Sequence, residues 1–442
     1  MRKVLLALIV ASGLLLAAFA YQQGVVEGSF GPAALFGTAV LALVCATFVA
    51  LYLLAGTRHR DTVAGILLAG FATLVSYVVV DVVAGWLLIK PLSPPLVADA
   101  VRHHRMVPDS YSEFRQKDFA YVQRVNHLGL RGADVTVEKP AGTRRILMLG
   151  DSFTMGKGVE DDQTFSVLVE DSLKRALASC GGGQLQVING GIDSYAPVLS
   201  MLELRRDLSV LRPDLIILNL DNSDLIQEAA YRRVALRDAR GEITAVPQLG
   251  RQSRYDKFRS WTERNLFFTR VLLVYVNRAF DHGELTVRSV VNEGGREHFA
   301  HTLAGDVDRT DQWRDIFESV ERIKQHSDSI GAEFVLTTYP WAHQLGDSGW
   351  VPGRYQYMKQ GEKTSDVTAR TIRDHAAGLG IDLFETFPFF KAYTGNEPLY
   401  FRYDPHWTPL GQSIMARALE QHVTEHHLPR WCGTPAPERA RR

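Results

Sequence analysis

The sequence predicts an α/β protein with a parallel sheet, preceded by an apolar N-terminal region. From residue 144 onward, short apolar runs alternate with segments of helical pattern, which is typical of a sheet whose strands are joined by helices. Before residue 90 the chain is far more apolar and contains long stretches without a charged side chain. The 49 Lys and Arg residues balance the 49 Asp and Glu residues, so charge gives no indication of a nucleic-acid partner.

Three uncharged stretches in the N-terminal region, residues 1–90, predict transmembrane helices at about 4–20, 33–55 and 62–80. Basic residues fix their orientation, because Arg2, Lys3 and the cluster 58–60 are expected on the cytoplasmic side. Everything after the third stretch then lies outside. We therefore expect a multi-pass inner-membrane protein with a periplasmic or otherwise extracytoplasmic domain, and the lipid bilayer as a partner. The first stretch also resembles a signal peptide, and its cleavage after residue 20 would leave this orientation unchanged.

Asp81 interrupts the apolar pattern near the end of the third stretch. It falls at roughly 28 Å along a helix that begins near residue 62. We expect it to mark the outer interface of the membrane, together with Trp86 at the level of the lipid headgroups.

The external part divides into a linker and N-terminal arm at 91–140, a domain at 141–430 and a tail at 431–442. Strands are predicted at 146–149, 185–189, 215–220, 334–338 and 381–384, and helices at 164–177, 198–208, 311–330, 364–379 and 409–426. Strands separated by helices pair in parallel, which predicts a three-layer sheet with helices on both faces.

An insertion at about 226–308 interrupts the alternation of strands and helices. Residues 234–246 have the pattern of a β-hairpin. The aromatic residues that follow are Tyr255, Phe258, Trp261, Phe267 and Phe268. These side chains either cap a pocket or form a small core within the insertion, and the sequence leaves both open.

Cysteine and histidine usage predicts no metal and no cofactor, because Cys-x-x-Cys and His-Glu-x-x-His motifs are absent. Cys45 lies within the second apolar stretch. Cys180 and Cys432 both lie in the external part, where an oxidising compartment permits a disulfide between them. His103 and His104 are expected to be solvated residues just outside the membrane.

A candidate nucleophile and its partners appear in the order Ser, Asp, His. Ser152 follows the predicted strand 146–149, and the carboxyl ends of strands carry the active sites of such sheets. A serine hydroxyl needs a neighbouring base, and Asp404 and His406 supply a base and a carboxylate to orient it. The alternative for Asp404 and His406 is a surface turn before a helix that Thr408 caps.

Acyl transfer also requires hydrogen-bond donors for the developing oxyanion. The Ser152 N–H is one candidate, and the N–H of Gly191 is a second because glycine lets the backbone approach a ligand. The third candidate is Asn222 or Ser223, in the loop after the strand at 215–220.

The motifs GDSF, NGG, a polar third loop and Asp-x-His-Trp together resemble the SGNH/GDSL hydrolase superfamily, over about residues 126–426. This resemblance implies a flavodoxin-like sheet, Ser152 as nucleophile, a triad completed by Asp404 and His406, and Gly191 in the oxyanion hole. The third block departs from the family's Gly-x-Asn-Asp, so that Asn222 or Ser223 must substitute. The block DPHW resembles the alginate O-acetyltransferase-type branch, whose members act on secreted polysaccharides.

The sequence therefore predicts a membrane-anchored serine esterase that acts on acyl esters, with acetyl as the expected group, of extracytoplasmic carbohydrate. One alternative is an O-acyltransferase that modifies a cell-surface or secreted polysaccharide. Another is a non-catalytic glycan-binding or assembly protein with the same fold. Acylated carbohydrate and polysaccharide-biosynthesis proteins are the expected partners.

Overall fold

The computed structural model describes residues 1–21, 32–55, 59–88, 96–115, 118–248, 261–262, 265–269, 295–346, 350, 352–356, 358 and 361–433. The chain forms two compact units. The first contains Met1–Pro91 and Gly250–Thr286, and the second contains Leu92–Leu249 and Val287–Arg442. The described residues 261–262 and 265–269 of the insertion predicted at 226–308 thus belong with the N-terminal helices and not with the sheet domain. Tyr255 and Phe258 lie outside the described residues.

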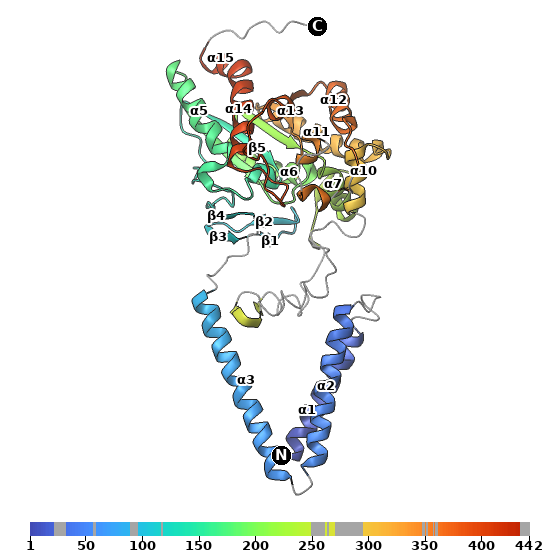
Figure 1. The fold of residues 1–442 in the computed structure, drawn as a ribbon. Helices are drawn as coiled ribbons and strands as arrows, with labels where there is room; N and C mark the ends of the chain where they lie inside the picture. Colours follow the sequence, from blue (N-terminus) through green and yellow to red (C-terminus); the bar gives the residue numbers. More distant parts are fainter. Residues whose placement is uncertain are drawn as a thin grey trace. The chain divides into compact units, whose positions relative to one another are not determined.

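The N-terminal unit contains three helices at the positions of the predicted spans: α1 (Arg2–Tyr21), α2 (Pro32–Leu54) and α3 (Arg60–Leu88). Helices α1 and α2 lie side by side (Figure 1). Within the described residues, only the stretch Arg60–Gly85 is long and apolar enough to cross a membrane, with a mean hydropathy of 2.3, while Leu41–Leu54 is a shorter apolar helix. That all three helices span a membrane stays a prediction.

Asp81 of α3 does more than interrupt an apolar helix. Its side chain is buried, and its carboxylate accepts hydrogen bonds from the Phe268 N–H and the Thr269 hydroxyl, both at 2.5 Å. Asp81 therefore binds the part of the insertion that belongs to the same unit. Trp261 and Phe268 are 50% and 43% exposed, so these two aromatic residues do not form the centre of a small core.

The second unit is built on a parallel sheet of five strands in the order β11-β10-β7-β5-β6. The strands are β5 (Thr143–Gly150), β6 (Gln184–Gly191), β7 (Leu215–Leu220), β10 (Glu333–Thr338) and β11 (Asp382–Glu385). Numbered along the chain, this order is 2-1-3-4-5, the arrangement of flavodoxin-like sheets. All five predicted strands are confirmed.

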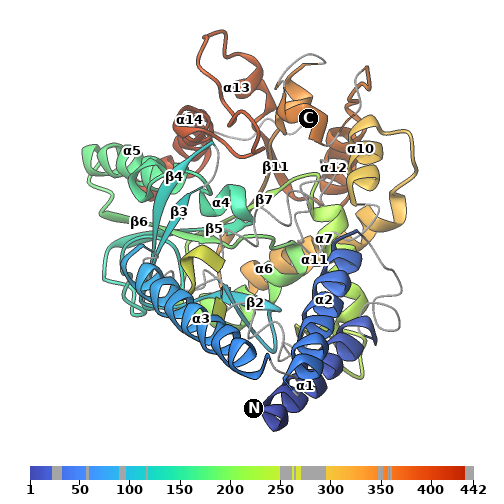
Figure 2. The ribbon, with the colours of Figure 1, turned by 60° about the horizontal axis from the view of Figure 1, so that its bottom comes forward.

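Helices cover both faces of the sheet, which confirms the predicted three layers. Successive residues of a strand point to opposite faces, so Ile146 and Met148 of β5 pack on one side and Leu147 and Leu149 on the other. The first side is covered by α5 (Phe165–Ser179) and α14 (Pro409–His426), and the second by α6 (Pro197–Glu203), α11 (Thr310–Ser329) and α12 (Val367–Gly378). Figure 2 shows the strands between these two sets of helices.

The remaining elements surround this sheet. They are the helices α4 (Ser152–Met155), α7 (Asp224–Val234), α10 (Gly295–Ala304), α13 (Phe387–Lys391) and α15 (Leu428–Trp431), and the strands β8 (Leu236–Arg237) and β9 (Ile243–Ala245). The antiparallel pairing of β8 with β9 confirms the predicted hairpin. The helix predicted at 198–208 ends as α6 at Glu203 and continues as a π-helical turn over Leu204–Leu208.

The N-terminal arm is more ordered than its irregular sequence suggests. It contains two antiparallel pairs, β1 (Leu96–Ala98) with β2 (His104–Met106) and β3 (Ser110–Arg115) with β4 (Ala120–Val125). Beyond β4, Arg131 forms a β-bridge to Asn189 in β6, at the edge of the sheet. The arm is thus attached to the sheet domain through backbone pairing.

A disulfide joins Cys180 at the end of α5 to Cys432 at the end of α15, with a Cα–Cα distance of 5.6 Å. The pairing that the sequence left open is therefore confirmed. The bridge connects positions 252 residues apart and ties the end of α5 to the end of α15.

Removing this bridge is expected to lower stability. A double Cys180→Ser, Cys432→Ser variant should lose about 2–5 kcal/mol of unfolding free energy, because the unfolded chain is no longer constrained by the long closed loop. Thermal unfolding of the full chain in detergent measures this, with Cys45→Ser as the matched control. Equal unfolding midpoints for wild type with and without reductant would contradict the prediction.

Candidate active site

Ser152 lies directly beyond β5, at the first position of the short helix α4. Asp151 caps this helix, because its carboxyl oxygen accepts the Phe153 N–H at 2.8 Å. The helix ends at Gly156, which adopts a left-handed conformation with φ 87°. The strand, the cap and the short helix together hold Ser152 at the carboxyl edge of the sheet.

The structure brings Ser152, His406 and Asp404 into one line of contacts. Nε2 of His406 lies 2.7 Å from Oγ of Ser152, and Nδ1 lies 2.5 Å from an oxygen of Asp404. With the Nδ1 proton held by the carboxylate, Nε2 is free to accept the hydroxyl proton. Ser152 and His406 are each only 7% exposed, although 254 residues separate them along the chain.

Asp404 is ionised over almost the whole pH range. Burial alone would raise its pKa, but the charge of His406 and the hydrogen bonds from its ring and backbone outweigh burial and lower the pKa to about 2. A carboxylate in this state fixes the tautomer of the imidazole and stabilises the imidazolium.

Aromatic side chains enclose the His406 ring. The Phe153 ring centroid lies 4.6 Å from it, and the fully buried Trp407 meets Phe153 edge-on at 4.9 Å. The Trp of the Asp-x-His-Trp block therefore packs in the core beside the site. Its bulk supports Phe153, which in turn restrains the imidazole.

Gly191 must be glycine for a steric reason. A Cβ at this position would lie 2.3 Å from the Met155 nitrogen, because the end of β6 passes directly against α4. Its N–H is donated to the Asn189 side-chain oxygen at 3.0 Å. That N–H is therefore not available to a substrate oxygen in this structure, contrary to the role expected from the sequence.

The loop after β7 holds the other expected donors. The Ser223 hydroxyl donates to Asp221 at 2.7 Å, so Ser223 is also engaged. The Asn222 side-chain amide donates one hydrogen to the Gln344 side-chain oxygen at 3.0 Å and retains a second hydrogen. Within the described residues, the Ser152 N–H has no acceptor. Of the expected donors, Ser152 and Asn222 stay candidates for an oxyanion hole.

A buried group that the sequence analysis missed lies beneath the nucleophile. Asp221 is only 1% exposed. One of its carboxylate oxygens accepts hydrogen bonds from the N–H and the hydroxyl of Ser223. The other accepts the Tyr339 hydroxyl at 3.0 Å and the Trp341 indole N–H at 2.8 Å. The Tyr339 hydroxyl also lies 3.2 Å from Asp151. The Tyr339 hydroxyl thus lies between two buried carboxyl groups.

Electrostatics disfavour the charged form of two of these carboxyl groups. Burial and the charge of Asp221 raise the pKa of Asp151 well above its usual range, and burial together with the same charge does so for Asp224. Asp151 and Asp224 are therefore protonated more readily than an ordinary aspartate. The sequence signal for this group was the aspartate at 221, where the family pattern has glycine.

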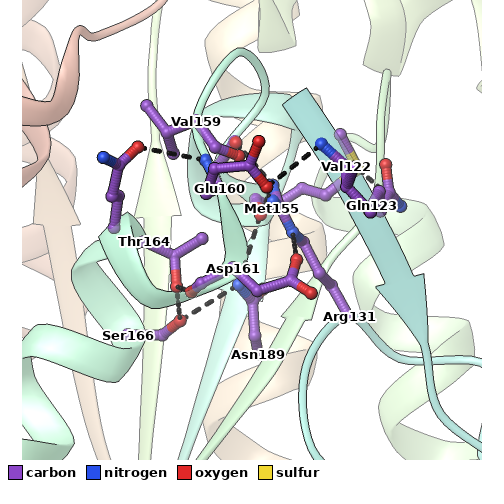
Figure 3. A network of polar contacts seen from close by, with 12 residues as sticks. Val122, Gln123, Arg131, Met155, Val159, Glu160, Asp161, Thr164, Ser166 and Asn189 are labelled. Carbon is purple, nitrogen blue, oxygen red and sulfur yellow. Dashed lines mark hydrogen bonds and ion pairs between the residues drawn. The ribbon is translucent and has the colours of Figure 1, made fainter. Parts of the chain in front are cut away.

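The N-terminal arm braces the loop that follows the nucleophile. The guanidinium of Arg131, only 3% exposed as a residue, donates to the backbone oxygens of Met155, Gly156 and Val159 at 3.1, 2.5 and 2.6 Å. It also pairs with Asp161 at 2.9 Å (Figure 3). Four acceptors on one rigid side chain fix the course of the loop.

The arm also contacts two other loops of the site. A carboxylate oxygen of Asp118 accepts the N–H groups of Tyr403 and Asp404 at 2.5 and 2.8 Å. The His104 ring donates from Nε2 to the Asp193 carbonyl at 2.7 Å. His104 is buried, and burial lowers its pKa, so the expectation of a solvated residue was wrong. The polar composition of the arm concealed these long-range contacts.

Across the described ranges, no three or more His, Cys, Asp or Glu side chains are grouped so that they could hold a metal ion.

No family model and no curated protein matches the chain. Among solved structures, the chain is similar to a lipase/acylhydrolase from Enterococcus faecalis, with 14% identity, 63% of this chain and 95% of that chain covered, and a TM-score of 0.33. It is also similar to Axe2, an acetylxylan esterase from Geobacillus stearothermophilus, with 12% identity, 67% and 97% coverage, and a TM-score of 0.33. Similarity at this level leaves the activity to be argued from the site itself.

Substitution of Arg131 tests the bracing of the nucleophile loop. Arg131→Met should lower the unfolding free energy by on the order of 3 kcal/mol, because buried acceptors lose their donor. Arg144→Met, which removes the 40%-exposed partner of Asp214, is the control and should cost under about 1 kcal/mol. Chemical denaturation of the full chain measures both, and equal effects would contradict the bracing role.

The depressed pKa of Asp404 predicts a specific acid sensitivity. Its pKa falls from 3.8 to about 2 on folding, so its contribution to stability is complete above pH 3.8 and is lost as the pH falls through about 2. Asp404→Asn should lose stability less steeply than wild type over this window. Unfolding midpoints of both proteins, measured at pH values about one unit apart between pH 5 and 2, provide the comparison. If the midpoints of the two proteins fell in parallel as the pH is lowered, the prediction would be wrong.

Proposed function

We propose that this chain is a membrane-anchored serine esterase of the SGNH/GDSL type, acting on acyl esters, with acetyl as the expected group, of extracytoplasmic carbohydrate. The observation that carries the proposal is the buried line of contacts from Ser152 through His406 to Asp404. A serine, a base and an orienting carboxylate at hydrogen-bond distance form the arrangement that activates a hydroxyl for attack on an ester. The flavodoxin-like strand order and the position of Ser152 after β5 also agree with the resemblance.

In this mechanism, Ser152 Oγ attacks the acyl carbon while His406 Nε2 takes the hydroxyl proton. The Ser152 N–H and the second amide hydrogen of Asn222 are the proposed donors to the oxyanion. The tetrahedral intermediate collapses to an acyl-serine, and His406 gives its proton to the departing sugar oxygen. Water then attacks the acyl-serine with His406 as base, which releases the carboxylic acid and restores Ser152.

Two observations support the proposed location outside the cytoplasm. The basic residues Arg2, Lys3 and Arg58–Arg60 flank the first three helices in the pattern of cytoplasmic loops. The disulfide between Cys180 and Cys432 lies in the sheet domain, and disulfides persist in oxidising compartments.

Acyl transfer to a sugar hydroxyl is the second candidate reaction. The Asp-x-His-Trp block favours it by resemblance, and the small exposure of Ser152 and His406, 7% each, limits the access of water. The two reactions share the acyl-serine and differ in the hydroxyl that receives the acyl group. A non-catalytic glycan-binding role is the third candidate, and its support is the engagement of Gly191 and Ser223 in internal hydrogen bonds.

Labelling and turnover test the nucleophile. The full chain in detergent should react with a fluorophosphonate probe and hydrolyse p-nitrophenyl acetate, and Ser152→Ala should abolish labelling and reduce kcat by about a thousandfold or more. The control is Ser179→Ala, an exposed serine at the end of α5, which should behave as wild type.

Each other result has a definite meaning. Folded wild type that neither labels nor turns over supports the glycan-binding role. An active Ser152→Ala variant excludes Ser152 as nucleophile. Product analysis with an added oligosaccharide acceptor then separates hydrolysis from transfer, because only transfer places the acyl group on the acceptor.

A further inference from the structure

An ion pair that the triad does not use lies beside the nucleophile. The ammonium of Lys157 is 3.2 Å from a carboxylate oxygen of Asp193, and the two side chains are 23% and 31% exposed. Ser152 and His406 are much more deeply buried. Lys157 and Asp193 are thus charged groups that solvent, and therefore a substrate, can reach next to the catalytic residues.

Backbone geometry places both residues next to Ser152. Strands β5 and β6 pair Gly150 with Gly191, and Ser152 and Asp193 each stand two residues beyond these partners. The Lys157 N–H donates to the Ser152 carbonyl at 3.0 Å. Lys157 therefore follows β5, and Asp193 follows its neighbour β6.

The turn that presents Asp193 is held firmly. The His104 ring donates to the Asp193 carbonyl at 2.7 Å, and the Tyr231 hydroxyl donates to the Ser194 carbonyl at 2.7 Å. Ser194 itself adopts a left-handed conformation with φ 64°, which a serine takes only where its surroundings require it. A carboxylate on a fixed turn can bind a ligand without a large ordering cost.

Both groups stay charged, and residues of the triad affect the pKa of each. Burial would raise the pKa of Asp193, but the charges of Lys157, His406 and His104 hold it below its usual range. Burial would lower the pKa of Lys157, but Asp193 and Asp404 raise it instead. The pair is thus on the His406 side of the site. His406 must hand its proton to the leaving oxygen, so the alcohol part of an ester lies on this side.

The chemistry of the pair selects the kind of alcohol. An ammonium offers only donors and an ionised carboxylate only acceptors, and sugar hydroxyl groups can both donate and accept. An alkyl or acyl-glycerol chain in the same place would remove water from these charged groups and offer no hydrogen bonds in return. Burying charged groups in this way costs free energy.

We propose that Lys157 and Asp193 form a subsite for the hydroxyl groups of a saccharide that carries the scissile ester. The inference rests on the proposed esterase function and names its substrate class. Hydroxyl groups adjacent to the ester accept from the Lys157 ammonium and donate to the Asp193 carboxylate. The subsite thereby positions the sugar oxygen near His406.

The test compares two acetyl esters with different alcohols, an O-acetylated cello-oligosaccharide and p-nitrophenyl acetate, on the full chain in detergent. Lys157→Met and Asp193→Asn should each lower kcat/KM for the saccharide by about tenfold to a hundredfold more than for p-nitrophenyl acetate, chiefly through KM. Lys174→Met, which breaks the exposed pair of Lys174 with Glu170 on α5, is the matched control and should leave the ratio of the two values as in wild type.

An equal loss of kcat/KM for both esters at every pH overturns the subsite. Such a result would mean that the substitutions act by changing the charge around His406 or the conformation of the loop, since either change affects both esters alike. A lack of any loss overturns it as well. Wild type that turns over p-nitrophenyl acetate through Ser152 but not the saccharide removes the subsite and leaves the esterase. Wild type that fails to label at Ser152 removes the proposed function, and the subsite with it.

Discussion

The short helix that carries Ser152 can stand where it does only because Gly191 has no side chain. The end of β6 passes so close to α4 that a Cβ at 191 would overlap the Met155 nitrogen. This approach fixes the nucleophile over the boundary between β5 and β6 and places Asp193 within reach of Lys157. The N–H of Gly191 is donated within the same strand, to the Asn189 side chain. A steric requirement, and not a donor to substrate, is what this glycine satisfies in the structure.

The site depends as much on the arm as on the sheet. The three loops that meet at the carboxyl edge carry Ser152, Asp193 and Asp404, and each is held by a different residue of the arm: Arg131, His104 and Asp118 respectively. Loops are otherwise the most mobile parts of such folds. A strand pair and a buried guanidinium supply the rigidity that a triad with hydrogen bonds of 2.5 and 2.7 Å requires.

The sheet could be predicted from sequence because its signal is local. Each strand is a short apolar run between helical patterns, and the parallel arrangement brings Ser152 to the carboxyl edge without further information. The contacts of the arm could not be predicted, since Asp118 and Arg131 look like ordinary surface residues and their partners lie up to 286 residues away. That two of the expected oxyanion donors bond within the protein could not be predicted, for a related reason. Whether the N–H of Gly191 or the hydroxyl of Ser223 is free depends on the orientation of Asn189 and Asp221, and residue types alone do not reveal orientation.

The disulfide can form only late in the synthesis of the chain. Ser152 is synthesised 254 residues before the histidine that activates it, and the tie from Cys180 closes only once residue 432 has been made. A nascent chain therefore holds Ser152 without His406 until residue 406 has been made. Cys432 is made after His406, and the disulfide joins the end of α5 to the end of α15. Every chain that carries this disulfide therefore also contains Ser152, Asp404 and His406.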